Sequence, residues 1–100
     1  MPLDSQHVAK YLCNYASEYV AAKRGELSTE FSRLVRKKHI DISFGTDAAG
    51  EGFRVYCTPR FRKVSAAETA VLKEGLSRLC EQPLEGSDII VRKPKYGVFA

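Results

Sequence analysis

The sequence predicts an α+β fold in a single domain covering residues 1–100, with the element order α-α-β-β-α-β. Apolar residues recur at helical spacing before residue 40 and again after residue 65. Between residues 40 and 58 they alternate with polar residues, as in strands. A β-branched run at 89–91 supplies a further strand. We therefore expect helices packed on one face of a small antiparallel or mixed sheet.

The first helix is predicted to begin after Asp4 or Ser5, either of which can cap it, and to reach about Arg24. Gly25 follows as the expected residue beyond the helix end. Apolar residues at steps of three and four predict one buried stripe along this helix. The stripe consists of Val8, Leu12, Tyr15, Ala16, Tyr19 and Val20.

A second helix is predicted from Ser28, whose hydroxyl can cap the first turn. Its apolar residues Phe31, Leu34 and Val35 are expected to face inward. The short link at residues 25–27 predicts that the two helices form either a helical hairpin or an L-shaped pair.

Two strands are predicted next, because apolar residues alternate from Ile40 to Phe44 and again from Phe53 to Cys57. The polar residues 45–52 are expected to join them as the long, mobile tip of an antiparallel hairpin. Pro59 has no amide hydrogen to donate, so it should end the second strand or place that strand at a sheet edge.

The third helix is predicted from a capping box in which Ser65 and Glu68 satisfy each other's backbone amides. Gly75 is a weak position within it, and the helix must stop before Pro83. Its expected buried face consists of Leu72, Leu76, Leu79 and Cys80. After the strand at 89–91, the tail from 94 onward, with Tyr96, Val98 and Phe99, is expected to dock on its own core or on another copy.

The bulk composition is that of an ordinary soluble globular chain, with 44% apolar residues, 28% charged residues and a net charge of +4. No apolar stretch approaches the ~20 residues that span a bilayer. The first residues lack the charged and apolar regions of a secretory signal. We therefore expect a cytoplasmic protein without a membrane partner.

The three cysteines, Cys13, Cys57 and Cys80, are an odd and widely spaced set, which favours reduced thiols. Each lies among apolar residues and is expected to be buried as a small hydrophobic side chain. The spacing lacks the Cys and His pairs of a zinc site, and the loop at 45–52 lacks the ending of a phosphate-binding P-loop. The sequence therefore predicts no metal site and no cofactor.

His7 and His39 are the only two histidines. Nucleophilic catalysis would require one of them beside a Cys or Ser and oriented by a carboxylate. Neither histidine lies in such a motif, so no catalytic residues are predicted. A small enzyme that uses Cys or His is the minor alternative.

Positive charge is concentrated between Phe31 and Val64, where eight Lys and Arg residues accompany only three acids. Such a field attracts an acidic partner, and arginine and aromatic side chains are enriched at the cores of interfaces. The candidate binding residues are Arg33, Arg36, Lys37, Lys38, Arg54, Tyr56, Arg60, Phe61, Arg62 and Lys63.

These residues predict a small non-enzymatic binding protein that regulates or inhibits a larger macromolecular partner, either a protein or a protein–nucleic acid complex. Direct binding of RNA or single-stranded DNA by the same surface is the alternative, because cations contact phosphates and aromatic rings stack on bases. The oligomeric state is left open by the sequence.

Overall fold

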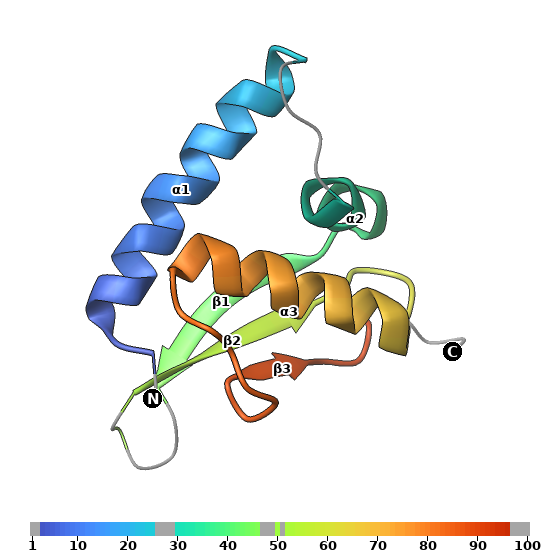
Figure 1. Cartoon of the computed structure of the whole chain (residues 1–100). Coiled ribbons are helices and arrows are strands. Elements are labelled where there is room, and N and C mark those ends of the chain that lie inside the picture. The colour runs from blue at the N-terminus through green and yellow to red at the C-terminus, as the bar shows by residue number, and fades with distance from the viewer. Residues whose placement is uncertain (1–2, 26–29, 47–49, 51, 97–100) are drawn as a thin grey trace.

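The structure is a computed structural model, and it describes residues 3–25, 30–46, 50 and 52–96. Its helices and strands follow one another in the predicted order, α-α-β-β-α-β (Figure 1). Within those residues, three helices accompany one three-stranded sheet. The elements are α1 (Ser5–Lys23), α2 (Glu30–Lys38), β1 (Asp41–Thr46), β2 (Phe53–Thr58), α3 (Ala66–Cys80) and β3 (Ile89–Val91). The predicted fold class is therefore confirmed.

The sheet is mixed and has the strand order β1-β2-β3. β1 and β2 form the predicted antiparallel hairpin, in which Asp41 lies opposite Thr58. β3 runs parallel to β2, with Val55 opposite Ile89, and α3 is the crossover that a parallel pair requires. Residues 47–49 and 51 of the predicted hairpin tip lie outside the described residues.

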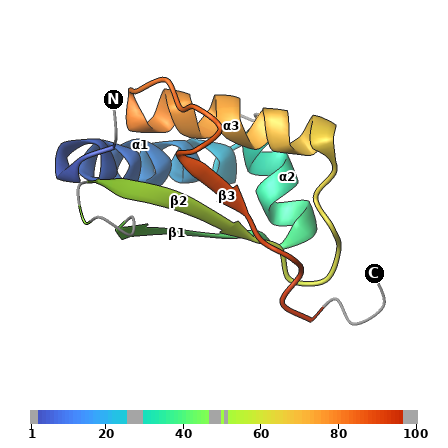
Figure 2. The same cartoon turned by 90° about the horizontal axis from the view of Figure 1, so that it is seen from below.

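The helices cover one face of the sheet, and Figure 2 shows α1 and α3 on the same side of β1 and β2. Val55 and Cys57 point toward the helices and are fully buried. Their neighbours Arg54 and Tyr56 point to the other face, because successive side chains of a strand alternate. Among the described residues, no helix covers that outer face.

The capping box begins α3 as predicted, and both of its hydrogen bonds are present. The Ser65 Oγ accepts from the Glu68 amide at 3.2 Å, and the Glu68 carboxylate accepts from the Ser65 amide at 2.9 Å. The helix ends at Cys80, where Glu81 adopts a left-handed φ of 56° before Pro83. The predicted buried face of α3 is confirmed: Leu72, Leu76, Leu79 and Cys80.

Gly75 of α3 lies where α2 crosses that helix. A Cβ atom placed on Gly75 would lie 2.5 Å from the Phe31 ring, so the missing side chain makes room for this aromatic residue. Phe31, Leu34 and Val35 are buried, as predicted for the second helix. The position that weakens α3 in isolation therefore allows α2 to approach it closely.

The predicted buried stripe of α1 is wrong for Leu12, Ala16, Tyr19 and Val20, which are exposed, whereas Val8 and Tyr15 are half-buried. Leu12, Tyr19 and Val20 are 60%, 49% and 47% exposed, whereas Tyr11 is the buried residue of this helix. Tyr11 packs edge-on against Phe44 of β1 with ring centroids 4.9 Å apart. The helix is apolar on two sides, and the spacing of its residues alone does not decide which side faces the core.

Polar contacts to α3 fix the rotation of α1. The Asn14 side-chain amide donates to the Leu79 carbonyl at 2.9 Å. One turn later, Arg78 donates to the Glu18 carboxylate at 2.6 Å. Because residues 11, 14, 15 and 18 share one side of a helix, these bonds turn Leu12 outward.

α1 and α2 do not form a helical hairpin. Both helices pack on α3, and Figure 1 shows α2 almost end-on where α1 runs across the view. This arrangement matches the L-shaped alternative. The predicted start of the second helix at Ser28 lies outside the described residues, which resume at Glu30.

Candidate binding surface

The end of α2 and the segment 60–63 lie together because the β1–β2 hairpin returns the chain to its starting point. The Arg60 amide donates to the Lys38 carbonyl at 3.5 Å. In return, the Lys38 Nζ donates to the Lys63 carbonyl at 2.7 Å. The two basic clusters of the sequence are thus neighbours at one end of the sheet.

Lys38 joins these segments and is not a free surface cation. Its Nζ lies 2.7 Å from the Glu68 carboxylate, and both side chains are largely covered. The hydrogen bond from Lys38, together with that from the Ser65 amide, lowers the pKa of Glu68 to about 2. Lys38 therefore positions the segment 60–63, and its ammonium group is already occupied by partners within the same chain.

A third segment, residues 92–96, reaches the same place by continuing alongside the chain after β2. The Arg92 amide donates to the Cys57 carbonyl at 2.9 Å, and the Lys95 amide donates to the Pro59 carbonyl at 2.9 Å. The Tyr96 amide then donates to the Arg60 carbonyl at 2.8 Å. The described part of the tail is thus docked on its own chain, and Val98 and Phe99 lie outside the described residues.

This docking produces a group of aromatic rings. The centroids of Phe61 and Tyr96 are 5.7 Å apart with an interplanar angle of 32°. Both side chains remain more than half exposed, at 56% and 54%. His39 lies edge-on to Phe61 at 6.3 Å and takes a left-handed φ of 51°, which places its ring beyond the end of α2.

A hollow of about 580 Å³ lies beside the rings, and its lining includes Lys37, Lys38, His39, Phe61, Arg62 and Glu68. Glu68 is the acid of this lining, and its charge is matched by Lys38. Within the described structure, Lys37, Arg60, Arg62 and Lys63 form no ion pair. We define the basic aromatic surface as Lys37, His39, Arg60, Phe61, Arg62, Lys63, Lys95 and Tyr96.

Two predicted site residues, Arg54 and Tyr56, lie instead on the outer face of the sheet. The Arg92 guanidinium stacks over the Tyr56 ring, 4.5 Å from its centroid. A Cβ on Gly45 would lie 2.9 Å from the same ring, so Tyr56 packs against the bare backbone of β1. The Tyr56 ring is therefore already covered, unlike the exposed rings of Phe61 and Tyr96.

The last two predicted residues lie on α2. Arg36 lines a crevice between α1 and α2 that also includes Tyr15 and Tyr19, and it lies outside the lining of the hollow. Arg33 is exposed one turn before Lys37 on the same side of the helix. The ten predicted residues thus separate into five at the basic aromatic surface, the paired Lys38 that supports it, two on the outer face of the sheet and two, Arg33 and Arg36, elsewhere on α2.

Sequence reasoning left His39, Lys95 and Tyr96 out of the candidate site. For Lys95 and Tyr96, the missing information was the pairing of the third strand. Parallel pairing of residues 89–91 with the second strand carries residues 92–96 along 57–60, whereas antiparallel pairing would send them the opposite way.

His7, Cys57 and Cys80 are arranged in ways that favour structural roles. His7 Nδ1 accepts the Asp4 amide at 3.1 Å within the cap of α1. Burial raises the pKa of Cys57 to about 12 and that of Cys80 to about 11. Both are buried as predicted, but Cys13 is exposed because it shares the outward-facing side of α1.

Among the described residues, no three His, Cys, Asp or Glu side chains converge as metal ligands. In the same part of the chain, no helix combines the length and apolar character needed to cross a membrane.

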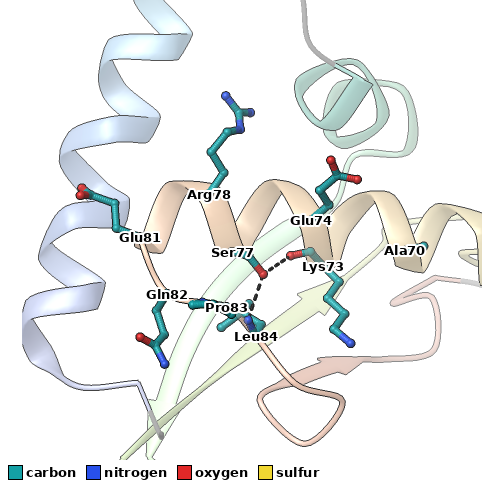
Figure 3. A pocket seen from close by; sticks show the side chains of 9 residues that line it. All are labelled: Ala70, Lys73, Glu74, Ser77, Arg78, Glu81, Gln82, Pro83 and Leu84. Carbon is teal, nitrogen blue, oxygen red and sulfur yellow. Dashed lines mark hydrogen bonds between the residues drawn. The ribbon is translucent and has the colours of Figure 1, made fainter.

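A second hollow, of about 550 Å³, lies along α3 and the segment that follows it (Figure 3). Ser77 Oγ donates to the Lys73 carbonyl at 2.7 Å and accepts from the Leu84 amide at 3.0 Å. Figure 3 shows Arg78 and Glu74 pointing away from Lys73 on the opposite side. The polar side chains around this hollow point in different directions, and the Ser77 hydroxyl already bonds the backbone. We therefore assign the hollow a structural role in joining α3 to the segment that follows it.

Searches of protein-family models, curated proteins and solved structures found no match to this chain.

Proposed function

We propose that the chain is a small non-enzymatic binding protein that docks its basic aromatic surface on an acidic region of a larger macromolecule and thereby regulates or inhibits it. The observation that carries the proposal is the exposed pair of rings, Phe61 and Tyr96, surrounded by cations without ion-pair partners in the described structure. Water-exposed aromatic rings are the usual anchors of interfaces, and arginine binds carboxylates through two parallel hydrogen bonds.

The arrangement of backbone hydrogen bonds supports the same proposal. The segments 60–63 and 92–96 have no regular secondary structure, yet Lys38, Pro59 and Arg60 fix their backbones. A surface that is ordered before binding loses less conformational entropy when its partner docks. The exposed rings are thus presented in a prepared geometry.

Affinity capture from a native lysate tests this proposal, with the wild type compared with Phe61→Ala and Arg62→Glu. We expect these variants to lose a protein partner that the wild type captures in the presence of nuclease. Lys10→Glu is the matched control, because Lys10 lies on α1 and its reversal changes the net charge as Arg62→Glu does. Equal capture by all four proteins would refute the proposal.

Direct binding of RNA or single-stranded DNA is the second candidate, and the two exposed rings of Phe61 and Tyr96, tilted by 32° to each other, favour it. Bases stack on such rings with little sequence preference, and cations contact the phosphates. Fluorescence anisotropy with a labelled single-stranded oligonucleotide should then show log affinity falling linearly with log salt, with a slope of about −0.7 per phosphate contact. The absence of binding at about 50 mM salt would exclude this candidate.

A further inference from the structure

A second surface lies on the side of α1 that faces away from α3 and the sheet (Figure 1). We define the outer face of α1 as Ala9, Leu12, Cys13, Ala16, Tyr19 and Val20. All six residues are exposed, and their spacing of three and four places them on one side of the helix. The six residues are uncharged, and Lys23, which continues the same spacing at the end of α1, holds its Nζ 5.4 Å from the centroid of the Tyr19 ring.

We infer that this outer face binds a second copy of the chain, so that two α1 helices pack against each other. An apolar band on one side of a helix is the usual mark of burial, and α1 already buries its opposite side against Phe44 and α3. The sequence pattern that predicts a buried stripe at Leu12, Tyr19 and Val20 is then correct for the assembly, although the three residues are exposed in one copy.

The order of side chains suits an antiparallel pair. Residues 9 and 19, and residues 12 and 16, are equally distant from residue 14. In an antiparallel pair centred there, Leu12 lies opposite Ala16 and Tyr19 lies opposite Ala9 of the second copy. Large side chains thus face small ones, as in well-packed helix interfaces.

Charges at the ends of α1 also favour the antiparallel direction. Lys23 ends the last turn, Arg24 follows it, and the exposed Asp4 carboxylate caps the first turn. An antiparallel pair places the cations of one copy near the acid of the other. A parallel pair would place like charges together.

The available area is that of a weak dimer. The outer face offers roughly 400–500 Å² per copy, so a pair buries about 800–1,000 Å² in total, below the size typical of stable complexes. We therefore expect a dimer that forms as the concentration rises and dissociates on dilution. A second copy also suits the uncharged centre of the outer face, because the opposing surface is equally apolar.

Sedimentation of the full chain over a concentration series up to about 0.5 mM tests the inference. We expect dimer formation in the wild type and a loss of about tenfold or more in association constant for Leu12→Asp and for Val20→Asp. Ser17→Asp is the matched control, because it adds the same charge at an exposed position of α1 beside the outer face. Unchanged thermal unfolding of dilute samples confirms that the variants are folded, as the exposure of Leu12 and Val20 predicts.

Two further measurements separate the possible origins of a dimer. Association through the outer face should persist in about 0.5 M salt, whereas association through the basic aromatic surface should weaken. Lys23→Glu should weaken an antiparallel dimer, because the substitution places a negative charge near the Asp4 carboxylate of the second copy. A monomer at every concentration, equal loss in Ser17→Asp, dissociation by salt, or a tighter dimer in Lys23→Glu would each overturn the inference as stated.

Discussion

The described structure exposes its large apolar side chains in two places that are built in different ways. Phe61 and Tyr96 stand among cations where three segments distant in sequence meet. Leu12, Tyr19 and Val20 lie on one uninterrupted helix, where Lys23 approaches the Tyr19 ring only at the helix end and Leu12 stands among uncharged neighbours of the outer face. Exposed apolar groups of similar size therefore suit different partners, because the charge around each group decides what kind of partner surface can pack against it.

The two surfaces also depend differently on the rest of the fold. The basic aromatic surface requires α2 to stay packed on α3, since Lys37 and His39 belong to the end of α2. The outer face of α1 requires only that α1 remains helical. Substitutions in the contact between α2 and α3 should therefore disturb the basic aromatic surface and leave the outer face of α1 intact.

The largest expected effect comes from Phe31→Ala. Phe31 is 2% exposed and packs on Gly75, so its truncation removes a close contact between α2 and α3. We expect a loss of about 3–5 kcal/mol in the free energy of unfolding, measured with urea. Leu12→Ala is the contrasting variant and should cost about 0.5 kcal/mol or less at low protein concentration. Similar losses in both variants would show that Leu12 is buried in the single chain.

Gly75→Ala should have a smaller effect in the same direction. The new Cβ meets the Phe31 ring at 2.5 Å, close to the backbone of α2, so a change of rotamer alone does not remove the clash. Overpacking costs about 1–3 kcal/mol, and the better helix propensity of alanine returns about 1 kcal/mol. Urea unfolding should therefore show a net loss, while Glu74→Ala on the exposed side of α3 should be nearly neutral. A stabilised Gly75→Ala variant would contradict the close crossing.

Local sequence signals were sufficient for most of the fold and for five of the eight residues of the basic aromatic surface. Ser65 and Glu68 identify the start of α3, and Pro59 the end of β2, because each acts on its own neighbours. The approach of Lys38 to Arg60 follows from an antiparallel hairpin, which returns the chain to its starting point. The position of Tyr96 could be predicted only if the direction of β3 relative to β2 were known. A run of three β-branched residues does not encode that direction.

The rotation of α1 could not be predicted for a different reason. Val8, Tyr11 and Tyr15 form one apolar series and Leu12 with Val20 belongs to another, so periodicity supports both. Partners distant in sequence decide between them: the Leu79 carbonyl and Arg78 select the side that carries Asn14 and Glu18. A helix with two apolar sides thus leaves its inner face undetermined until tertiary contacts are known.

The pH dependence of stability provides a third and smaller test. The folded state lowers the pKa of Glu68 from 4.5 to about 2, so this carboxylate stabilises the fold fully above about pH 4.5 and progressively less as the pH falls toward 2. Glu68→Gln keeps a capping side chain but not the charge, and should be less stable by about 0.5–1 kcal/mol at pH 7. Urea unfolding from pH 7 to pH 2.5 should show this gap narrowing.

The same variant distinguishes the two surfaces. Loss of the Lys38–Glu68 pair loosens the segment 60–63, so binding through the basic aromatic surface should weaken while dimerisation through α1 stays unchanged. Glu74→Gln is the control, since Glu74 is exposed on the same helix. A stability gap that is constant with pH would contradict the paired carboxylate.

The smallest expected effect concerns the thiols. In the folded protein we expect Ellman's reagent to modify Cys13 quickly, and Cys57 and Cys80 only at the rate of unfolding, because burial raises the pKa values of the latter two. Cys13 lies within the outer face of α1, so its reaction should slow as the protein concentration rises and copies associate. In Leu12→Asp that concentration dependence should vanish. Protection of Cys13 that persists in dilute Leu12→Asp would mean that the single chain covers its own helix, and the contrast between the two exposed surfaces would then fail.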